Sequence, residues 1–166
     1  MAEDQKTMEA AEKWSEAEKN AYILQKLDNL VERLLGGIEN ADAKAQIREQ
    51  WHTLPDAEKT TRAIHTMIVI GSRYAALGVD GATSAWKDTV VMITFIIKKG
   101  IEGGMIPIAK DTLSEAELDS LLQFIFREMW KTVRCLLHVL ADIKLPEDMP
   151  GDTHLPYTMP SIFKAT

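Results

Sequence analysis

The feature that most constrains this chain is the apolar end of a segment that runs from Trp86 to Ile97 and reads Trp-Lys-Asp-Thr-Val-Val-Met-Ile-Thr-Phe-Ile-Ile. Its last eight residues are apolar except Thr94, so a helix formed by them has no polar face and must be covered on all sides. A run of this length is shorter than the roughly 20 apolar residues that cross a bilayer. We therefore predict a helix at the centre of a soluble structure, without a membrane span. Its predicted core residues are Val90, Val91, Ile93, Phe95, Ile96 and Ile97.

A buried β-strand is the competing interpretation of this run, because Val, Ile and Thr favour strands. The sequence offers no second strand-like run nearby to pair with it, and a lone strand leaves its backbone groups without hydrogen bonds. Lys98, Lys99 and Gly100 follow the run, as basic residues and glycine do at the end of a helix. The sequence therefore favours the helix.

Capping signals predict where the other helices begin. Residues 15–18 match the capping box, in which a hydroxyl and a carboxylate satisfy free backbone amides, and residues 112–115 match it again, overlapped by residues 114–117. Asn40 is a predicted N-cap, and residues 53–56 combine a capping hydroxyl with a proline in the first turn. Gly78 is a predicted helix end. With the apolar spacing of three and four, these signals place helices over 15–36, 41–52, 53–78 and 115–143, after a helix-permissive segment over 2–14.

The last of these helices is the longest. It carries one continuous apolar stripe from Leu118 to Ile143, and at 1.5 Å per residue it measures about 43 Å. It therefore spans the structure or bends once. Taken together, the elements predict an all-α fold: a single-domain bundle of five or six helices over residues 1–145, around an apolar central helix.

The final 21 residues differ from the rest of the chain, because they contain four of its six prolines. Proline excludes a continuous helix, so residues 146–166 are predicted to form an extended C-terminal tail. Large apolar side chains on an extended backbone commonly dock into a groove, either on the same molecule or on a neighbour. The predicted partner-binding residues of the tail are Tyr157, Met159, Ile162 and Phe163.

Composition sets limits on compartment and partner. The formal net charge of −6 disfavours a surface devoted to nucleic acid, since phosphate backbones bind positive faces. The single cysteine, Cys135, cannot form an internal disulfide, which fits a reducing compartment. The acidic first residues are not followed by the apolar segment of a secretory signal. We therefore expect a cytoplasmic protein.

Patterns for catalysis and metal binding are incomplete. Glu49-x-x-His52 has the spacing of a di-iron ligand pair but occurs once, whereas such centres use it twice. Cys135-x-x-His138 leaves a tetrahedral zinc ion short of ligands. Neither a Gly-x-Ser-x-Gly segment nor a phosphate-binding glycine loop is present. The sequence predicts no catalytic, metal, cofactor or small-molecule site, and so no enzyme.

One further pattern lies on the last predicted helix. Four basic residues recur at i, i+4, i+7 and i+11, which keeps them within about 60° of one another on one face. Bases interleaved with aromatic rings suit a phosphate backbone with stacked bases. A solvated face, or pairing with an acidic protein surface, explains the same pattern. The candidate nucleic-acid-binding residues are Phe124, Arg127, Trp130, Lys131, Arg134 and His138.

These observations favour a non-catalytic protein that binds other proteins or assembles with itself. It would act as an adaptor or as a repeated structural subunit of a larger complex. The long last helix and the apolar anchors of the tail carry this expectation. The alternative is a helical subunit that binds nucleic acid through the basic face of its last helix.

Overall fold

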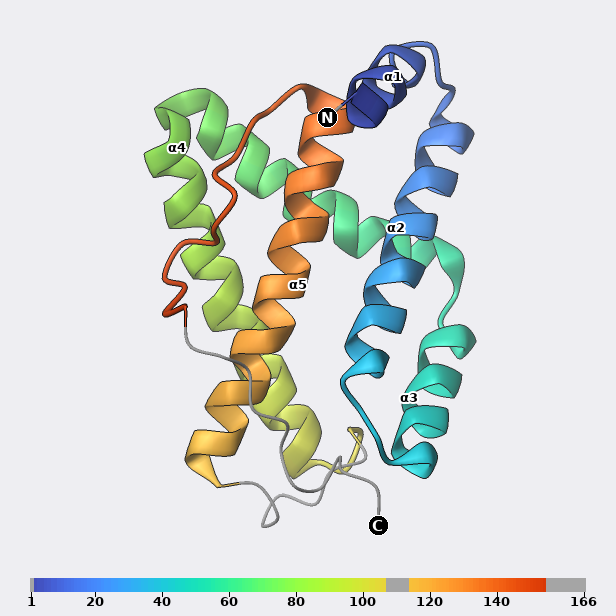
Figure 1. The fold of residues 1–166 in the computed structure, drawn as a ribbon, viewed down its shortest axis with the longest axis vertical. Coiled ribbons are helices and arrows are strands. Elements are labelled where there is room, and N and C mark those ends of the chain that lie inside the picture. The colour runs from blue at the N-terminus through green and yellow to red at the C-terminus, as the bar shows by residue number, and fades with distance from the viewer. Residues whose placement is uncertain (1, 107–113, 155–166) are drawn as a thin grey trace.

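The computed structural model of the chain describes residues 2–106 and 114–154. These residues form five helices and no strand, so the all-α prediction is confirmed (Figure 1). The helix boundaries lie close to those expected from the capping and spacing signals, except that α4 joins the helix predicted before Gly78 to the one predicted over the apolar run. The helices are α1 (Ala2–Ala11), α2 (Glu16–Gly36), α3 (Ala41–Thr53), α4 (Asp56–Glu102) and α5 (Glu115–Ala141).

Capping explains where most of these helices begin. Ser15 and Glu18 form the expected capping box at the start of α2, and Ser114 and Glu117 form the one at the start of α5. The Asn40 side chain accepts hydrogen bonds from backbone N–H groups in the first turn of α3, again as predicted. Thr53 differs from its prediction, because it ends α3 and donates its hydroxyl to the Gln50 carbonyl at 2.9 Å.

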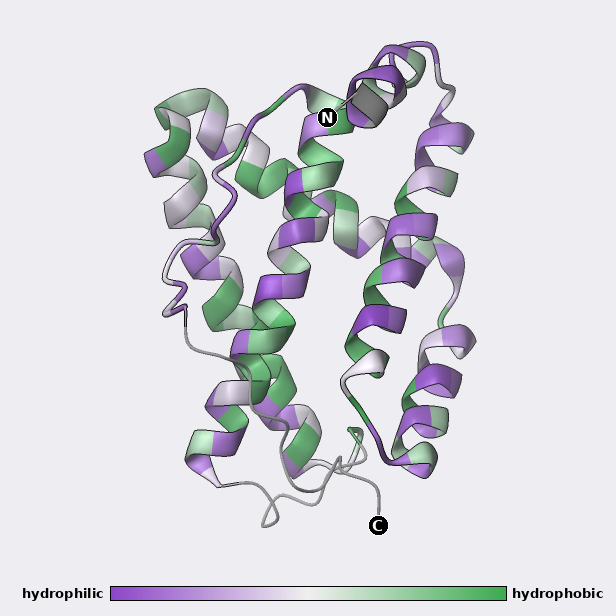
Figure 2. Cartoon of the chain, viewed as in Figure 1, coloured by the Kyte–Doolittle hydropathy of each residue, from purple (hydrophilic) through white to green (hydrophobic). Residues whose placement is uncertain are grey.

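The helix at the centre of the structure is α5, which contacts α1, α2 and α4. Figure 1 shows it between α2 on one side and α4 on the other. Hydrophilic positions interrupt the apolar ones along the whole of α5 (Figure 2), yet several of its faces are covered. Its buried residues are Leu121, Leu122, Phe126, Trp130, Thr132, Val133, Leu136, Leu137 and Val139.

The predicted helix over the apolar run is present within α4, but the prediction that it lies at the centre of the structure is wrong. Val90, Ile93 and Ile97 pack partly buried against the core. The opposite face is open to solvent, because α4 is packed along one side only. Its exposed fractions are 71% for Val91, 51% for Met92, 61% for Phe95 and 54% for Ile96.

A bend divides α4 into a first arm over 56–77 and a second arm over 79–102. Gly78 has φ 67° and ψ −147°, a conformation that side-chain-bearing residues rarely adopt. At Gly81 a Cβ would overlap the Arg73 carbonyl oxygen, so only glycine lets the arms approach this closely. Arg73 Nη1 lies 2.6 Å from Asp88 Oδ2 across the bend. The predicted helix end at Gly78 is thus a sharp bend.

The face that the first arm buries differs from its apolar pattern. Lys59 is buried, with its ammonium 4.5 Å from the centre of the Trp51 ring and 3.8 Å from Asp56 Oδ1. Ile68, an apolar residue of the same arm, is exposed. The face that the first arm buries is therefore rotated relative to the one expected from its apolar residues.

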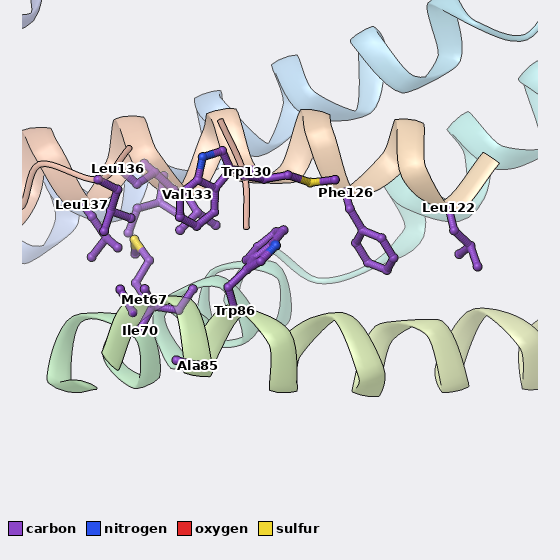
Figure 3. Packing of buried hydrophobic residues seen from close by; sticks show 14 residues of the cluster. Met67, Ile70, Ala85, Trp86, Leu122, Phe126, Trp130, Val133, Leu136 and Leu137 are labelled. Atoms are coloured by element: carbon purple, nitrogen blue, oxygen red, sulfur yellow. The ribbon is translucent and has the colours of Figure 1, made fainter. Parts of the chain in front are cut away.

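The contact between α4 and α5 is built on two indole rings that are almost fully buried. The rings of Trp86 and Trp130 lie 5.0 Å apart at 65°, and Phe126 meets Trp86 edge-on at 6.4 Å (Figure 3). Trp130 Nε1 donates a hydrogen bond to the Pro146 carbonyl at 3.0 Å. This bond satisfies the polar edge of a buried indole, and it attaches the segment after α5 to the core.

A polar contact joins α2 to α5. Arg33 Nε lies 2.8 Å from Glu128 Oε2, and Arg33 Nη2 donates to the Thr132 hydroxyl at 2.9 Å. Burial of the Glu128 carboxyl favours its neutral form, but hydrogen bonds from Arg33 and Lys131 outweigh this effect and hold its pKa below the usual value. Glu128 therefore stays ionised between these two helices.

A pair of substitutions on the second arm of α4 tests which of its faces is packed. Trp86→Ala removes a fully buried ring and should lower the free energy of unfolding by about 3–5 kcal/mol. Phe95→Ala, nine residues further on, removes an exposed ring and should change it by no more than about 0.5 kcal/mol. Urea unfolding followed by circular dichroism measures both. Equal losses in the two variants would show that Phe95 belongs to the core.

Candidate interaction surfaces

The first candidate surface is the outer side of the second arm of α4. We call Val91, Met92, Phe95 and Ile96 the α4 face. All four side chains are more than half exposed, and they are adjacent because residues three and four apart share a side of a helix. The Lys99 ammonium lies 5.7 Å from the centre of the Phe95 ring at one end of the face.

A contiguous patch of large exposed apolar side chains is uncommon on a monomeric protein and often marks a site of association. Their exposure is costly, because burial of apolar surface contributes about 25 cal/mol per Å². Three of these residues were predicted to lie in the core, so the surface that they form was not predicted. The apolar run itself was the only indication of such a surface in the sequence. It shows that these side chains must be packed against something, but not which molecule supplies the contact.

The second candidate surface is an apolar pocket of about 750 Å³ between α2, α3, the end of α4 and the start of α5. Leu34, Ile101 and Phe124 line it, and its polar lining is limited to side chains such as Gln50. Small-molecule sites have this size but usually add several convergent polar groups that fix the ligand. The pocket therefore has the size of a small-molecule site but few polar groups that would orient a substrate.

The third candidate surface is a cavity of about 650 Å³ between α5 and the segment that follows it. The four basic residues predicted from the sequence all line this cavity. The carboxylates of Glu147, Asp148 and Asp152 line it as well. The structure thus brings together the basic row Arg127, Lys131, Arg134 and His138.

Within this cavity, three members of the basic row already have partners in the same chain. Arg127 Nε donates to Asp152 Oδ1 at 3.0 Å, and its Nη2 lies 2.9 Å from the same oxygen. Lys131 Nζ lies 3.0 Å from Glu128 Oε1. Arg134 Nη1 donates to the Glu147 carbonyl at 3.4 Å. The charges that a phosphate backbone would need are therefore largely engaged.

Of the two aromatic residues expected beside the basic row, Trp130 lines the same cavity, but its ring is only 2% exposed and packs against Trp86. Phe124 lines the apolar pocket at the start of α5. Neither ring offers an open face beside the basic row for a base to stack on. The sequence spacing was correct, but it did not show that the chain after α5 folds back over this face.

Asp152 connects that returning segment to α5. Its Oδ1 accepts hydrogen bonds from Gln123 at 3.0 Å, from Arg127 and from the His154 backbone N–H at 2.9 Å. Burial of the carboxyl favours its neutral form, but these donors outweigh that effect and lower its pKa below the usual value. The ionised carboxylate therefore stabilises the folded segment.

The residues considered for catalysis or metal binding do not form a site in the described ranges. No three His, Cys, Asp or Glu side chains within residues 2–106 and 114–154 come together as metal ligands. Cys135 Sγ lies 3.7 Å from the Tyr22 hydroxyl. The pKa of Tyr22 is raised, mainly because the hydroxyl is buried and to a smaller extent because of this contact. Glu49 and His52 are exposed on α3.

Two further findings concern the remaining predictions. In the part of the chain that the structure describes, no helix has the length and apolarity needed to cross a membrane. The predicted anchors of the tail, Tyr157, Met159, Ile162 and Phe163, lie outside the described residues.

The chain matches no protein-family model, no curated protein and no solved structure. A functional hypothesis for this chain therefore rests on the chemistry of the three surfaces.

The role of Asp152 predicts a stability that depends on pH. Asp152→Asn should lower the free energy of unfolding at pH 7 by about 1–2 kcal/mol, because hydrogen bonds to a charged group are lost. Since the folded-state pKa lies below the usual value of about 3.9, the unfolded chain binds the proton more readily and stability rises with pH. The difference from the unmutated protein should therefore shrink as the pH falls below about 4.

Asp148→Asn is the matched control, because this carboxylate is exposed and its neighbour His154 Nε2 is 4.0 Å away. Chemical denaturation of both variants from neutral to acid pH makes the comparison. An Asp152→Asn protein as stable as the Asp148→Asn control at pH 7 would contradict the assigned role.

Proposed function

We propose that this protein is a non-catalytic protein–protein interaction or assembly subunit, an adaptor or a repeated part of a larger complex, and that the α4 face is its contact surface. The observation that supports the proposal is the exposure of Val91, Met92, Phe95 and Ile96. These residues belong to the most apolar run of the chain, yet they lie outside its own core.

The construction of the second arm supports this proposal. Trp86 fixes one side of the helix to α5, so the other side is presented on a rigid element. Docking of a rigid helix face loses little conformational entropy, because its side chains and backbone are already ordered. Recognition through residues spaced i, i+3 and i+4 on a helix is a common mode of protein association.

The nucleic-acid alternative has weaker support. Arg127 and Lys131 form ion pairs with carboxylates of the same chain, and Trp130 is buried. A phosphate backbone would have to displace Asp152 and the segment that carries it. Three further expectations stay predictions beside the main proposal. They are the domain limits at 1–145 and 146–166, the partner role of the tail and the cytoplasmic location.

Substitution of the α4 face tests the proposal in the native host. We expect the tagged full chain to purify as an assembly larger than one copy. Phe95→Glu should return it to the mass of a single chain, because a buried charge without a partner opposes docking. Native mass measurement by light scattering after mild purification distinguishes the two states.

Ile68→Glu is the matched control, since Ile68 is an exposed apolar residue on the other arm of the same helix. It should leave the assembly intact. Thermal midpoints of both variants should stay near that of the unmutated protein. An assembly whose mass is unchanged by Phe95→Glu would contradict the proposal. A large drop in the thermal midpoint of that variant alone would contradict it as well.

A further inference from the structure

The α4 face continues at both ends into charged residues that share its direction. Asp88, Met92, Phe95 and Lys99 are spaced by four, three and four residues, which is the seam of a helix pair. The two charged ends are eleven residues apart, so they lie about 16 Å apart and within about 20° of the same direction. Val91 and Ile96 flank the seam.

The charges at the two ends are opposite and accessible. The Asp88 side chain is 64% exposed beside Arg73, and the Lys99 side chain is 61% exposed beside Glu102 at 3.5 Å. One end of the seam therefore carries the pair Arg73 and Asp88, and the other carries Lys99 and Glu102. The outermost residue of the seam itself is negative at one end and positive at the other.

Such a seam is complementary to itself only when two copies run in opposite directions. In an antiparallel pair, a two-fold axis between Ile93 and Thr94 places Asp88 opposite Lys99 of the partner subunit at both ends. The same axis places Met92 opposite Phe95 of the partner subunit. A parallel pair would instead place Asp88 against its own copy and Lys99 against its own copy, which is repulsive.

We propose that a second copy of this chain is the partner of the α4 face, bound as an antiparallel two-fold dimer. This inference rests on the proposed function and names its partner. The four apolar side chains form the centre of the contact. At each end, Arg73, Asp88 and the partner subunit's Lys99 and Glu102 alternate in sign, so the interface carries no net charge from these groups.

The size of the contact sets its expected strength. Stable interfaces bury about 800 Å² on each partner, and one helix face of three turns supplies less than that. The dimer should therefore dissociate on dilution. We expect a monomer–dimer equilibrium within a concentration range of about 1–500 µM, with no larger species, because a two-fold contact closes on itself.

The first test is sedimentation equilibrium of the purified full chain over that range. The expected result is a change from the mass of one chain to that of two. Phe95→Glu should raise the dissociation constant by tenfold or more, whereas Ile68→Glu should leave it unchanged. A single chain mass at every concentration overturns the proposal.

The second test exchanges the charges at the ends of the seam. Asp88→Lys alone and Lys99→Asp alone should each weaken the dimer, because each puts like charges opposite one another at both ends. An equimolar mixture of the two variants should recover association as a mixed dimer, since every opposing pair is again opposite in charge. Lys98→Asp is the control, because Lys98 points about 100° away from the seam.

The outcomes separate this inference from the proposed function. Failure of the mixture to associate more tightly than either variant overturns the antiparallel dimer. A chain that is monomeric throughout, but whose native assembly still requires Phe95, overturns the second copy as partner and leaves the α4 face as the site for a different protein. If neither association depends on Phe95, the proposed function fails as well.

Discussion

The contact between Trp86 and Trp130 is the interaction on which the rest of the structure depends. Two indoles 5.0 Å apart fix the second arm of α4 against α5, and large aromatic rings contribute more buried surface than any other side chains. The Trp130 N–H bonds to the Pro146 carbonyl, so the same ring also holds the segment after α5. One pair of residues thereby sets the position of three parts of the chain.

That arrangement decides which surfaces are covered and which are open. The returning segment covers the basic face of α5, buries Leu145 and Met149, and supplies Asp152 to Arg127. No comparable segment in the described residues lies on the outer side of α4, where Phe95 and its neighbours are exposed. Three of the four basic side chains of the last helix thus have partners in the same chain, while the α4 face is exposed.

Much of the secondary structure followed from local signals, because caps such as Ser15, Asn40 and Ser114 act within a few residues. The position of each helix did not follow. Residues 90–97 are apolar except Thr94, which indicates that other residues must pack against them. Whether those residues belong to the same molecule is decided by contacts distant in sequence. The basic row was correctly grouped on one face, yet the pairing of Arg127 with Asp152 depends on a chain reversal after α5 that no spacing in the helix encodes.

Radical footprinting read by mass spectrometry tests most directly the claim that α4 has one packed face and one open face. In dilute protein, where the chain is a monomer, Met92 and Phe95 should be oxidised readily, while Trp86 and Trp130 on the packed side should be protected. As the concentration rises, Met92 and Phe95 should become protected and the two tryptophans should not change. Protection of Met92 and Phe95 in the dilute monomer would contradict the account, because it would place the α4 face inside the protein's own fold.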